Sequence, residues 1–381
     1  MRLTFIHDHK FFYEDGEYYS SGKFSSEVMS RYIVDSIDEI QFIGRVQQVV
    51  GDLDSLSKTS TEKIKVNPMP FLKNKIDFVL KRLEINKFLQ KNIKDTDIVI
   101  IRLPSELGYL ALEYLENKNI AYGIELVGDP WDALWYHGSI AGKLMAFVNK
   151  QKVKKYMEKS KHNIYVTREY LQKKYPSENY FIASNVLIDR VENNYQNRKN
   201  KTKKIGMIGS LDSKYKGIDT ALKSLHLINH EFLFEIVGNG PQEEWIKRID
   251  NYGLQDKVKL LGTLKSGEEI NTWLSTLDLY IQPSYTEGLP RALIEAMSNG
   301  IPALGSTAGG IPELLRNKYL HEIKDYKFLG KQIRTVLNDD EFREKMSKEN
   351  LETANRYLNK NIQNERERFI KSILRECSYE S

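Results

Sequence analysis

Short apolar runs alternate with longer stretches of helical period along the whole chain. The runs are rich in β-branched residues, which favours strands. Between them, stretches such as residues 76–89 carry apolar side chains every three or four positions, the pattern of an amphipathic helix. The predicted strands are residues 3–6, 40–43, 98–101, 120–124, 164–167 and 180–183 in the first half, and 204–208, 232–237, 258–261, 279–282 and 302–305 in the second. This alternation predicts an α/β fold of parallel sheets with helices on both faces.

Both halves show the same alternation, so we expect two doubly wound, Rossmann-like domains. Residues 191–204 are polar, contain four asparagines and show no hydrophobic period, which predicts an interdomain linker. An N-terminal domain would then span residues 1–190 and a C-terminal domain residues 205–345. Residues 346–381 predict further helices with charges on most faces. The length of 381 residues fits two domains at roughly 150 residues each.

Composition excludes several classes of protein. Hydrophobic residues make up 40% and charged residues 29%, as in soluble globular proteins, which excludes disordered, collagenous and coiled-coil chains. The net charge of +5 is far from that of a protein that coats nucleic acid, so no nucleic-acid partner is expected. The single cysteine, Cys377, excludes an internal disulfide framework. Since no leader segment or membrane-length apolar run is visible, we expect a cytoplasmic protein, at most peripheral to the inner face of a membrane.

Several motif matches fail on inspection. Residues 16–24 resemble a phosphate loop, but five residues separate the glycines and Phe24 stands where Ser or Thr would meet magnesium. No GxGxxG follows a strand, so a nicotinamide or flavin site is not supported. His7 and His9 flank Asp8 at a spacing that can hold a metal. Because no third ligand is evident, we favour a hydrogen-bonding loop there and expect no metal.

The most informative segment is residues 278–315. A buried strand ends at Gln282 and is followed by the turn-forming sequence PSYTEG. Pro290 suits the first position of a helix, and Gly300 ends that helix. Gly288 and Leu289 would therefore lie at a helix N-terminus, where free N–H groups and the helix dipole favour an anion such as phosphate.

Two glutamates frame this turn and helix. Glu287 and Glu295 would lie roughly 12 Å apart at 1.5 Å per residue, too far to share a proton. The spacing suits one carboxylate at a sugar ring and another at ribose hydroxyls, with a diphosphate between them. In the alternative interpretation, Glu287 is an exposed acidic residue at a helix start, which the helix dipole favours, and Glu295 is a solvated residue in mid-helix. For either glutamate considered alone, we prefer this alternative.

Taken whole, the segment resembles the signature of the family 4 retaining glycosyltransferases, which have the GT-B fold, and in particular their bacterial polysaccharide-building members. In that signature a Glu-Gly-x-Pro sequence precedes Glu-Ala-Met, then Gly-x-Pro and Gly-Gly-x-x-Glu. The matching residues are Glu287, Gly288, Pro290, Glu295, Ala296, Met297, Gly300, Pro302, Gly309, Gly310 and Glu313.

The resemblance extends over most of the second half. Lys216 matches the lysine that pairs with the donor diphosphate, and Gly262 matches a turn near the base. Ser210 stands where the family often has arginine, so part of the usual phosphate clamp is missing or supplied elsewhere. The resemblance places the donor on Gly209, Ser210, Gly238, Asn239, Gly288, Leu289, Pro290 and Glu295.

For the first half, the resemblance to acceptor-domain loops is less specific. Ligands of such sheets meet the carboxyl ends of strands, so residues leaving the strands are the candidates. They are His7, Asp8, Arg102, Glu125 and Asp129. For each one, a structural hydrogen-bonding role is as good an interpretation as an acceptor contact.

Residues 143–161 contain seven lysines and one glutamate. Leu144, Phe147, Val148, Tyr156 and Met157 would fall near one face of a helix. A basic amphipathic helix can lie on an anionic membrane. The alternative, which we prefer, is a solvated helix that packs its apolar face on the sheet.

The resemblance implies a GT-B glycosyltransferase, with two domains that face each other across a cleft and last helices that cross back to the first domain. It would transfer a sugar, with retention and without metal or cofactor, from a nucleotide-diphosphate sugar to a saccharide acceptor. We expect a UDP-sugar, a lipid-linked acceptor and a role in surface polysaccharide synthesis. Lys216 would stabilise the leaving diphosphate and Glu287 would orient the sugar. The alternative function is a non-catalytic nucleotide-sugar-binding protein on the same fold.

Overall fold

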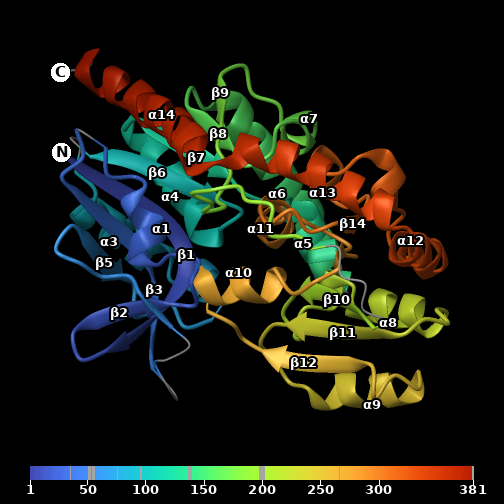
Figure 1. The fold of residues 1–381 in the computed structure, drawn as a ribbon. Helices are drawn as coiled ribbons and strands as arrows, with labels where there is room; N and C mark the ends of the chain where they lie inside the picture. Colours follow the sequence, from blue (N-terminus) through green and yellow to red (C-terminus); the bar gives the residue numbers. More distant parts are fainter. Residues whose placement is uncertain are drawn as a thin grey trace. The chain divides into compact units, whose positions relative to one another are not determined.

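The computed structural model describes residues 1–381 except 35, 50–52, 54–55, 75, 95–96, 136–139, 197–201, 266 and 380–381. The side chains of residues 133–135, 140–141, 143–144 and 377–379 also lie outside the description, and these include that of Cys377. The chain forms two compact units (Figure 1). Unit 1 comprises Met1–Trp131, Lys143–Ala183 and Ile362–Ser381, and unit 2 comprises Asp132–Gly142 and Ser184–Asn361.

Unit 1 is built on a largely parallel sheet. Its strands are β1 (Arg2–Glu14), β2 (Glu17–Ser20), β3 (Glu39–Gln48), β4 (Ser57–Lys58), β5 (Ile64–Pro68), β6 (Ile98–Leu103), β7 (Tyr122–Leu126), β8 (Asn163–Tyr165) and β9 (Tyr180–Ile182). The parallel strands run in the order β5-β3-β1-β6-β7-β8-β9, with the first strand of the chain inside the sheet. All six residues of β6 are buried, as expected of a strand covered on both faces.

The first strand is much longer than predicted. We expected it to end at residue 6 and release His7 and Asp8 into a loop, and this expectation is wrong. β1 continues to Glu14, with a register shift against β3 between Ile6 and Lys10. It then turns into the antiparallel strand β2 through Asp15 and Gly16, whose φ angles are 47° and 85°. An Asp-Gly pair is a strong signal for such a hairpin, and the sequence interpretation missed it.

The helices of unit 1 begin with a broken segment. The helix predicted over residues 76–89 is interrupted at Lys81 (φ −106°, ψ 26°), whose ammonium group donates to the carbonyl of Phe71 at 2.7 Å. The last helix packs on this unit's sheet, because a Cβ added at Gly123 would lie 2.5 Å from Phe369 and Ile373. The helices are α1 (Ser26–Ser30), α2 (Asp77–Leu80), α3 (Arg82–Asn92), α4 (Glu106–Lys118), α7 (Tyr170–Lys174) and most of α14 (Asn359–Tyr379), while α5 (Pro130–Trp135) and α6 (Ile140–Lys159) each extend over both units.

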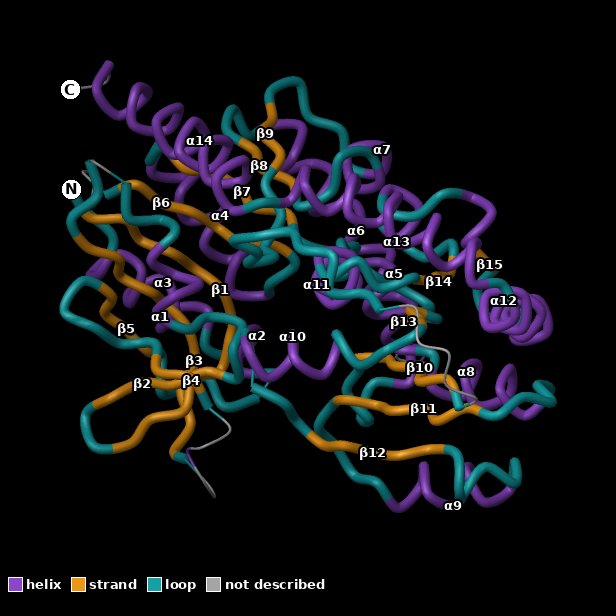
Figure 2. Tube along the Cα trace, in the orientation of Figure 1, coloured by secondary structure: helices purple, strands orange, loops and turns teal. Residues whose placement is uncertain are grey.

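Unit 2 holds the second sheet. Its strands are β10 (Lys203–Ile208), β11 (Phe232–Val237), β12 (Val258–Gly262), β13 (Leu279–Gln282), β14 (Ala303–Ser306) and β15 (Leu320–His321). All are parallel, in the order β12-β11-β10-β13-β14-β15 (Figure 2). This is the doubly wound order 3-2-1-4-5-6, whose connections reverse direction between β10 and β13.

Helices complete unit 2, and α12 packs closely on α8, since a Cβ at Gly330 would lie 3.0 Å from the carbonyl oxygen of Ser224. They are η2 (Lys214–Lys216), α8 (Ile218–His226), α9 (Glu243–Asn251), α10 (Glu268–Leu274), α11 (Arg291–Ser298), η3 (Ile311–Glu313), η4 (Asn317–Tyr319), α12 (Tyr326–Asn338), α13 (Asp340–Ala354) and η5 (Asn355–Tyr357).

The predicted linker, residues 191–204, begins inside unit 2. The N–H groups of Glu192 and Asn194 donate to the carbonyls of Ser298 and Asn299, at 2.9 and 3.1 Å. Residues 197–201 lie outside the described residues, and β10 begins at Lys203. The start of this polar segment is therefore fastened to the end of α11.

Candidate functional site

The centre of unit 2 brings together the two residues predicted to be catalytic. Because the connections of the sheet reverse between β10 and β13, the segments that follow these two strands meet at their carboxyl ends, where such folds bind ligands. Lys216 reaches this point from η2 and Glu287 from the turn after β13. The Nζ atom of Lys216 lies 2.8 Å from Oε1 of Glu287.

The Glu287 carboxylate is held by further hydrogen bonds. Oε1 also accepts from Oγ of Ser284 at 2.7 Å and from Nε2 of Gln282 at 3.0 Å. Gln282 is itself fixed by the hydroxyl of Tyr280, which donates to Oε1 of the amide at 2.8 Å. The sequence interpretation missed Gln282 and Ser284 as functional residues. Their only signal was their place at a strand end directly before Glu287.

The charged side chain of Lys216 is largely buried, with only 22% of its surface exposed. Burial lowers the pKa of its ammonium group, but Glu287 outweighs burial and the pKa is raised above its ordinary value. The chain turns at Gly217, where φ is 77° and an added Cβ would lie 1.9 Å from the carbonyl oxygen of Pro283. Only glycine permits this close approach, which brings η2 against the turn after β13.

A helix N-terminus follows Glu287, as predicted. Pro290 is the N-cap residue, with ψ at 106°, so α11 begins one residue later than we expected. Within the described part of the chain, the N–H groups of Gly288 and Leu289 have no hydrogen-bond acceptor. Gly310 fastens the turn from the other side by donating to the carbonyl of Gly288 at 2.8 Å. The arrangement leaves two backbone donors directly after Glu287, whose carboxylate binds Lys216, and such a helix start suits an anion.

The second predicted carboxylate, that of Glu295, has a different environment. It is half-buried in α11, and no described residue donates a hydrogen bond to its side chain. Burial raises the pKa of Glu295, and Arg291 opposes the shift. Arg291 also opposes the rise in the pKa of Lys216, so this arginine is a second cation that acts electrostatically on both groups. The sequence interpretation did not consider Arg291.

The glycine-rich turns after β10 and β11 lie against each other. A Cβ at Gly238 would lie 2.0 Å from the carbonyl oxygen of Gly209, and one at Gly209 would lie 3.1 Å from Cβ of Lys216. The Ser210 hydroxyl donates to the carbonyl of Asn239 at 3.2 Å. Ser210 therefore joins the two turns and supplies no positive charge.

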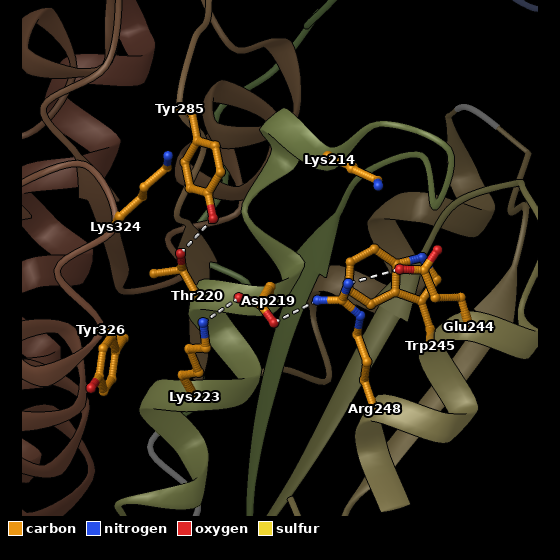
Figure 3. Close-up of a pocket in the computed structure, with 10 residues that line it drawn as sticks. All are labelled: Lys214, Asp219, Thr220, Lys223, Glu244, Trp245, Arg248, Tyr285, Lys324 and Tyr326. Carbon is orange, nitrogen blue, oxygen red and sulfur yellow. Dashed lines mark hydrogen bonds and ion pairs between the residues drawn. The ribbon is translucent and has the colours of Figure 1, made fainter. Parts of the chain in front are cut away.

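A cavity of about 370 Å³ lies beside these segments (Figure 3). Its lining residues are Lys214, Asp219, Thr220, Lys223, Glu244, Trp245, Arg248, Tyr285, Lys324 and Tyr326. Asp219 is paired with Lys223 at 2.7 Å and with Arg248 at 2.8 Å. None of the predicted donor residues lines this cavity, so it is distinct from the predicted donor site.

In unit 1, two of the predicted acceptor-side residues bind each other. Nε of Arg102 lies 3.0 Å from Oε2 of Glu125, and both side chains are buried. The Tyr32 hydroxyl donates to Glu125 at 2.8 Å and accepts from Arg102 at 2.9 Å. Burial raises the pKa of Glu125, but Arg102, Arg366 and the hydrogen bond from Tyr32 together outweigh burial, and the pKa is lowered. The pair clearly has a structural role, because its two charges bind each other and Tyr32 in the core. Its role in binding the acceptor stays a prediction.

The other acceptor-side candidates also have structural partners. Oδ2 of Asp8 accepts from the N–H of Glu106 at 3.0 Å, at the start of α4. Asp129 is buried and accepts from Tyr170, Lys174 and Tyr175. The imidazole of His7 lies 5.2 Å from the ring of Phe24, and burial, together with Arg102, lowers its pKa to about 3. His7 is therefore neutral at physiological pH.

No three His, Cys, Asp or Glu side chains among the described residues are grouped so that they could hold a metal ion. None of their helices has both the length and the apolar character needed to cross a bilayer.

Comparison with known proteins adds independent information. The sequence model of the family described as "Glycosyl transferases group 1" matches residues 189–353. Protein CapJ of Staphylococcus aureus is 34% identical over 374 residues, which cover 97% of this chain and 95% of CapJ. The amylovoran biosynthesis glycosyltransferase AmsK of Erwinia amylovora is 37% identical over 112 residues, 27% of each chain. These matches confirm the resemblance found in the sequence.

The fold is likewise matched among solved structures. The structure of Anabaena HepE in complex with UDP-glucose covers 100% of both chains with a TM-score of 0.67, at 15% sequence identity. At that identity the match concerns the fold alone. It confirms the predicted GT-B architecture of two Rossmann-like domains.

Proposed function

Since the chain belongs to the group 1 glycosyl transferases, and is thus a glycosyltransferase of GT-B fold, we propose that it transfers a sugar from a UDP-sugar with retention of anomeric configuration. The acceptor is a lipid-linked saccharide, and the product is part of a surface polysaccharide. The descriptions of two similar proteins support this choice of donor and product. AmsK is described as an amylovoran biosynthesis glycosyltransferase, and HepE was solved with UDP-glucose.

The observation that carries the proposal is the Lys216–Glu287 pair beside the start of α11. A diphosphate at this point would meet the ammonium group of Lys216 and the free N–H groups of Gly288 and Leu289. These donors would stabilise the charge that grows on the diphosphate as the sugar leaves. Glu287, held by Gln282 and Ser284, would position the sugar ring.

Glu295 and Arg291 complete the donor site in this proposal. The Glu295 carboxylate has no hydrogen-bond donor within the described residues and would accept from ribose hydroxyls. Arg291 acts electrostatically on both Lys216 and Glu295. It would supply the second positive charge that Ser210 does not provide.

The test is a donor assay with matched variants. Thermal shifts are measured with uridine, guanosine and adenosine diphosphate sugars, since a binder at 100 times its Kd stabilises by roughly 2.7 kcal/mol. Slow hydrolysis of the best donor is then compared for the wild type, Glu287→Gln and Lys216→Met, with the exposed Lys247→Met as control. We expect both site variants to lose about 100-fold or more in rate while Glu287→Gln keeps donor binding. Unchanged rates in both would contradict the proposal, and NMR of the released sugar would show whether the configuration is retained.

One observation favours a second candidate, a non-catalytic nucleotide-sugar-binding protein. Ser210 carries no charge where the family often has arginine, and its hydroxyl is used to bind Asn239. In that case the wild type would bind a UDP-sugar but would neither hydrolyse nor transfer it.

A further inference from the structure

Unit 1 exposes an unusual group of large apolar side chains on α2 and the first turn of α3. Ile76, Val79, Leu80 and Leu83 are between 62% and 78% exposed. Single exposed apolar residues need no explanation, but four within eight positions form a patch of the kind that marks an interaction site. The buried residues of the same segment, such as Phe78 and Ile85, already supply its contact with the core.

A second exposed apolar group lies on α6. Met145, Phe147 and Val148 are between 40% and 55% exposed, while Ala146, Val153 and Met157 face the core. The sequence predicted that Phe147, Val148 and Met157 lie near one face of a helix and that this face packs on the sheet. Met157 is buried as predicted, but Phe147 and Val148 are exposed, so the prediction is wrong for these two. The side chains of Lys143 and Leu144 lie outside the described residues.

The two groups lie on helices that have a neighbour in common, α4. The guanidinium of Arg82, at the start of α3, pairs with Glu113 of α4. On α6, Lys159 lies 3.6 Å from Glu116 of α4, and Nδ2 of Asn149 donates to Glu106 of α4 at 3.2 Å. Helices α3 and α6 thus both pack beside α4. We call the exposed apolar residues of α2, α3 and α6, with the lysines around them, the α2–α6 surface.

Lysines outnumber acidic residues on this surface. Its exposed lysines are Lys73, Lys87, Lys152, Lys154, Lys155 and Lys159. Of the glutamates nearby, Glu113 is paired with Arg82, Glu158 lies 3.8 Å from Lys154, and Glu116 lies 3.6 Å from Lys159. Glu84, on α3, is also exposed. Apolar side chains flanked by lysines match a bilayer with anionic headgroups, where each lysine adds to binding. A second copy of the chain fits poorly, because the same lysines would face one another.

We propose that the α2–α6 surface docks this protein on an anionic lipid bilayer, with Ile76, Val79, Leu80, Leu83 and Phe147 entering the interfacial region. This names a partner for unit 1 and deepens the proposed function, because a lipid-linked acceptor would be presented at the same membrane. The observations behind it are independent of the transfer reaction. Binding can therefore be measured without donor or acceptor, and failure of one proposal leaves the other standing.

The experiment is co-sedimentation of the full chain with vesicles. Phosphatidylcholine vesicles are compared with vesicles that also contain about 30% phosphatidylglycerol, at low and at physiological salt. We expect binding to the anionic vesicles to be about tenfold stronger and to weaken as salt rises. No binding to anionic vesicles, or equal binding to both kinds, would overturn the proposal.

Two sets of variants test the residues themselves. The triple variant Val79→Ser, Leu80→Ser, Leu83→Ser and the double variant Lys152→Gln, Lys155→Gln should each weaken binding about tenfold. The matched controls lie in unit 2 and should bind as the wild type does. They are Leu227→Ser, Ile246→Ser, Phe328→Ser for the apolar set, and Lys247→Gln, Lys327→Gln for the lysine set.

Retained folding of each variant is checked by circular dichroism and thermal unfolding, and the exposed positions should leave both unchanged. Sedimentation equilibrium on the same proteins tests the competing occupant. A dimer that is lost in the triple serine variant, with vesicle binding kept, would overturn the proposal in favour of a second copy. A wild-type monomer together with weakened vesicle binding in that variant supports the bilayer.

Discussion

Gly309 lies directly against the backbone of Glu287: a Cβ added at Gly309 would be 1.9 Å from the Glu287 carbonyl oxygen. The φ angle of Gly309 is 56°, and the next residue, Gly310, donates to the carbonyl of Gly288. The glycine pair therefore supports the turn that presents Glu287, although Gly309 lies 22 positions after Glu287 in the sequence.

Substitution of Gly309 should damage both stability and the site. We expect Gly309→Ala to lower the free energy of unfolding by about 2–4 kcal/mol, because the methyl group overlaps a backbone carbonyl that cannot move independently. Gly253→Ala is the matched control. The φ angle of Gly253 is 65°, and no atom lies within 4 Å of the added Cβ. Only the strain of the left-handed backbone conformation should therefore lower the free energy of unfolding, by about 1 kcal/mol. Urea unfolding measures both, and equal losses in the two variants would show that the contact with Glu287 is relaxed.

Glu295 should destabilise the protein in the absence of donor. Burial raises the pKa of this carboxyl on folding, so the folded state holds its proton more tightly. Stability therefore falls as pH rises above the unfolded pKa of about 4.3. We expect Glu295→Gln to raise the Tm at pH 7.5 by about 1–3 °C, and this gain to disappear at pH 4.

Donor binding should respond in the opposite direction. Glu295→Gln should weaken UDP-sugar binding by about tenfold, since a charged acceptor for ribose hydroxyls becomes a neutral amide. The exposed Glu268→Gln on α10 is the control for both measurements and should change neither. If Glu295→Gln lowers the Tm at neutral pH, the carboxylate has a stabilising partner and the assignment to the donor site is wrong.

The Arg102–Glu125 pair should carry much of the stability of unit 1. Loss of one partner from a buried ion pair is costly, and here Arg366 and the Tyr32 hydroxyl would still act on Glu125. Arg102→Met should therefore cost about 3 kcal/mol of unfolding free energy, the lower end of the usual range. The pKa of Glu125 is lowered on folding, so its contribution is present above the unfolded pKa of about 4.3 and is lost as pH falls.

The control for this pair is exposed on the same sheet. Lys65 lies 2.9 Å from Glu39 at the surface, and Lys65→Met should cost less than about 1 kcal/mol. Chemical denaturation without ligands at pH 7 and pH 4 compares the two variants. A stable Arg102→Met protein with only a raised acceptor KM would instead show that Arg102 serves the acceptor.

Local signals in the sequence predicted most of the elements and the second-half motif. Strand β11 (Phe232–Val237) and strand β13 (Leu279–Gln282) have the predicted ends. Gly300 ends α11 as expected, with φ at 71°. These features depend on a few neighbouring residues, through hydrophobic period and backbone conformation, so the sequence alone can specify them. The Asp15–Gly16 hairpin is equally local, because the Asp-Gly pair by itself favours such a turn.

The family motif predicted which residues gather in unit 2 but not how they are held. Lys216 and Glu287 are 71 residues apart, and the reversal of strand order between β10 and β13 brings them together. The residues next to Gln282 and Ser284 in the sequence form no motif that would indicate their function. Their hydrogen bonds to Glu287 depend on the exact path of the turn. Such partners follow from three-dimensional packing, which no spacing rule encodes.

The sequence by itself determined the fold class, the succession of elements and the residues of the family motif, because period, turns and short motifs act over a few residues. Only the tertiary structure decided which charged side chains form ion pairs inside the protein and which side chains stay exposed to solvent. Arg102 and Glu125 lie within the adjacent strands β6 and β7 as register partners, so their side chains meet and form an ion pair. Val79 and Leu83 read as part of an amphipathic helix, yet the break at Lys81 leaves them exposed. Burial and pairing depend on residues far away in the chain, and only the folded sheet and its helices bring those residues into contact.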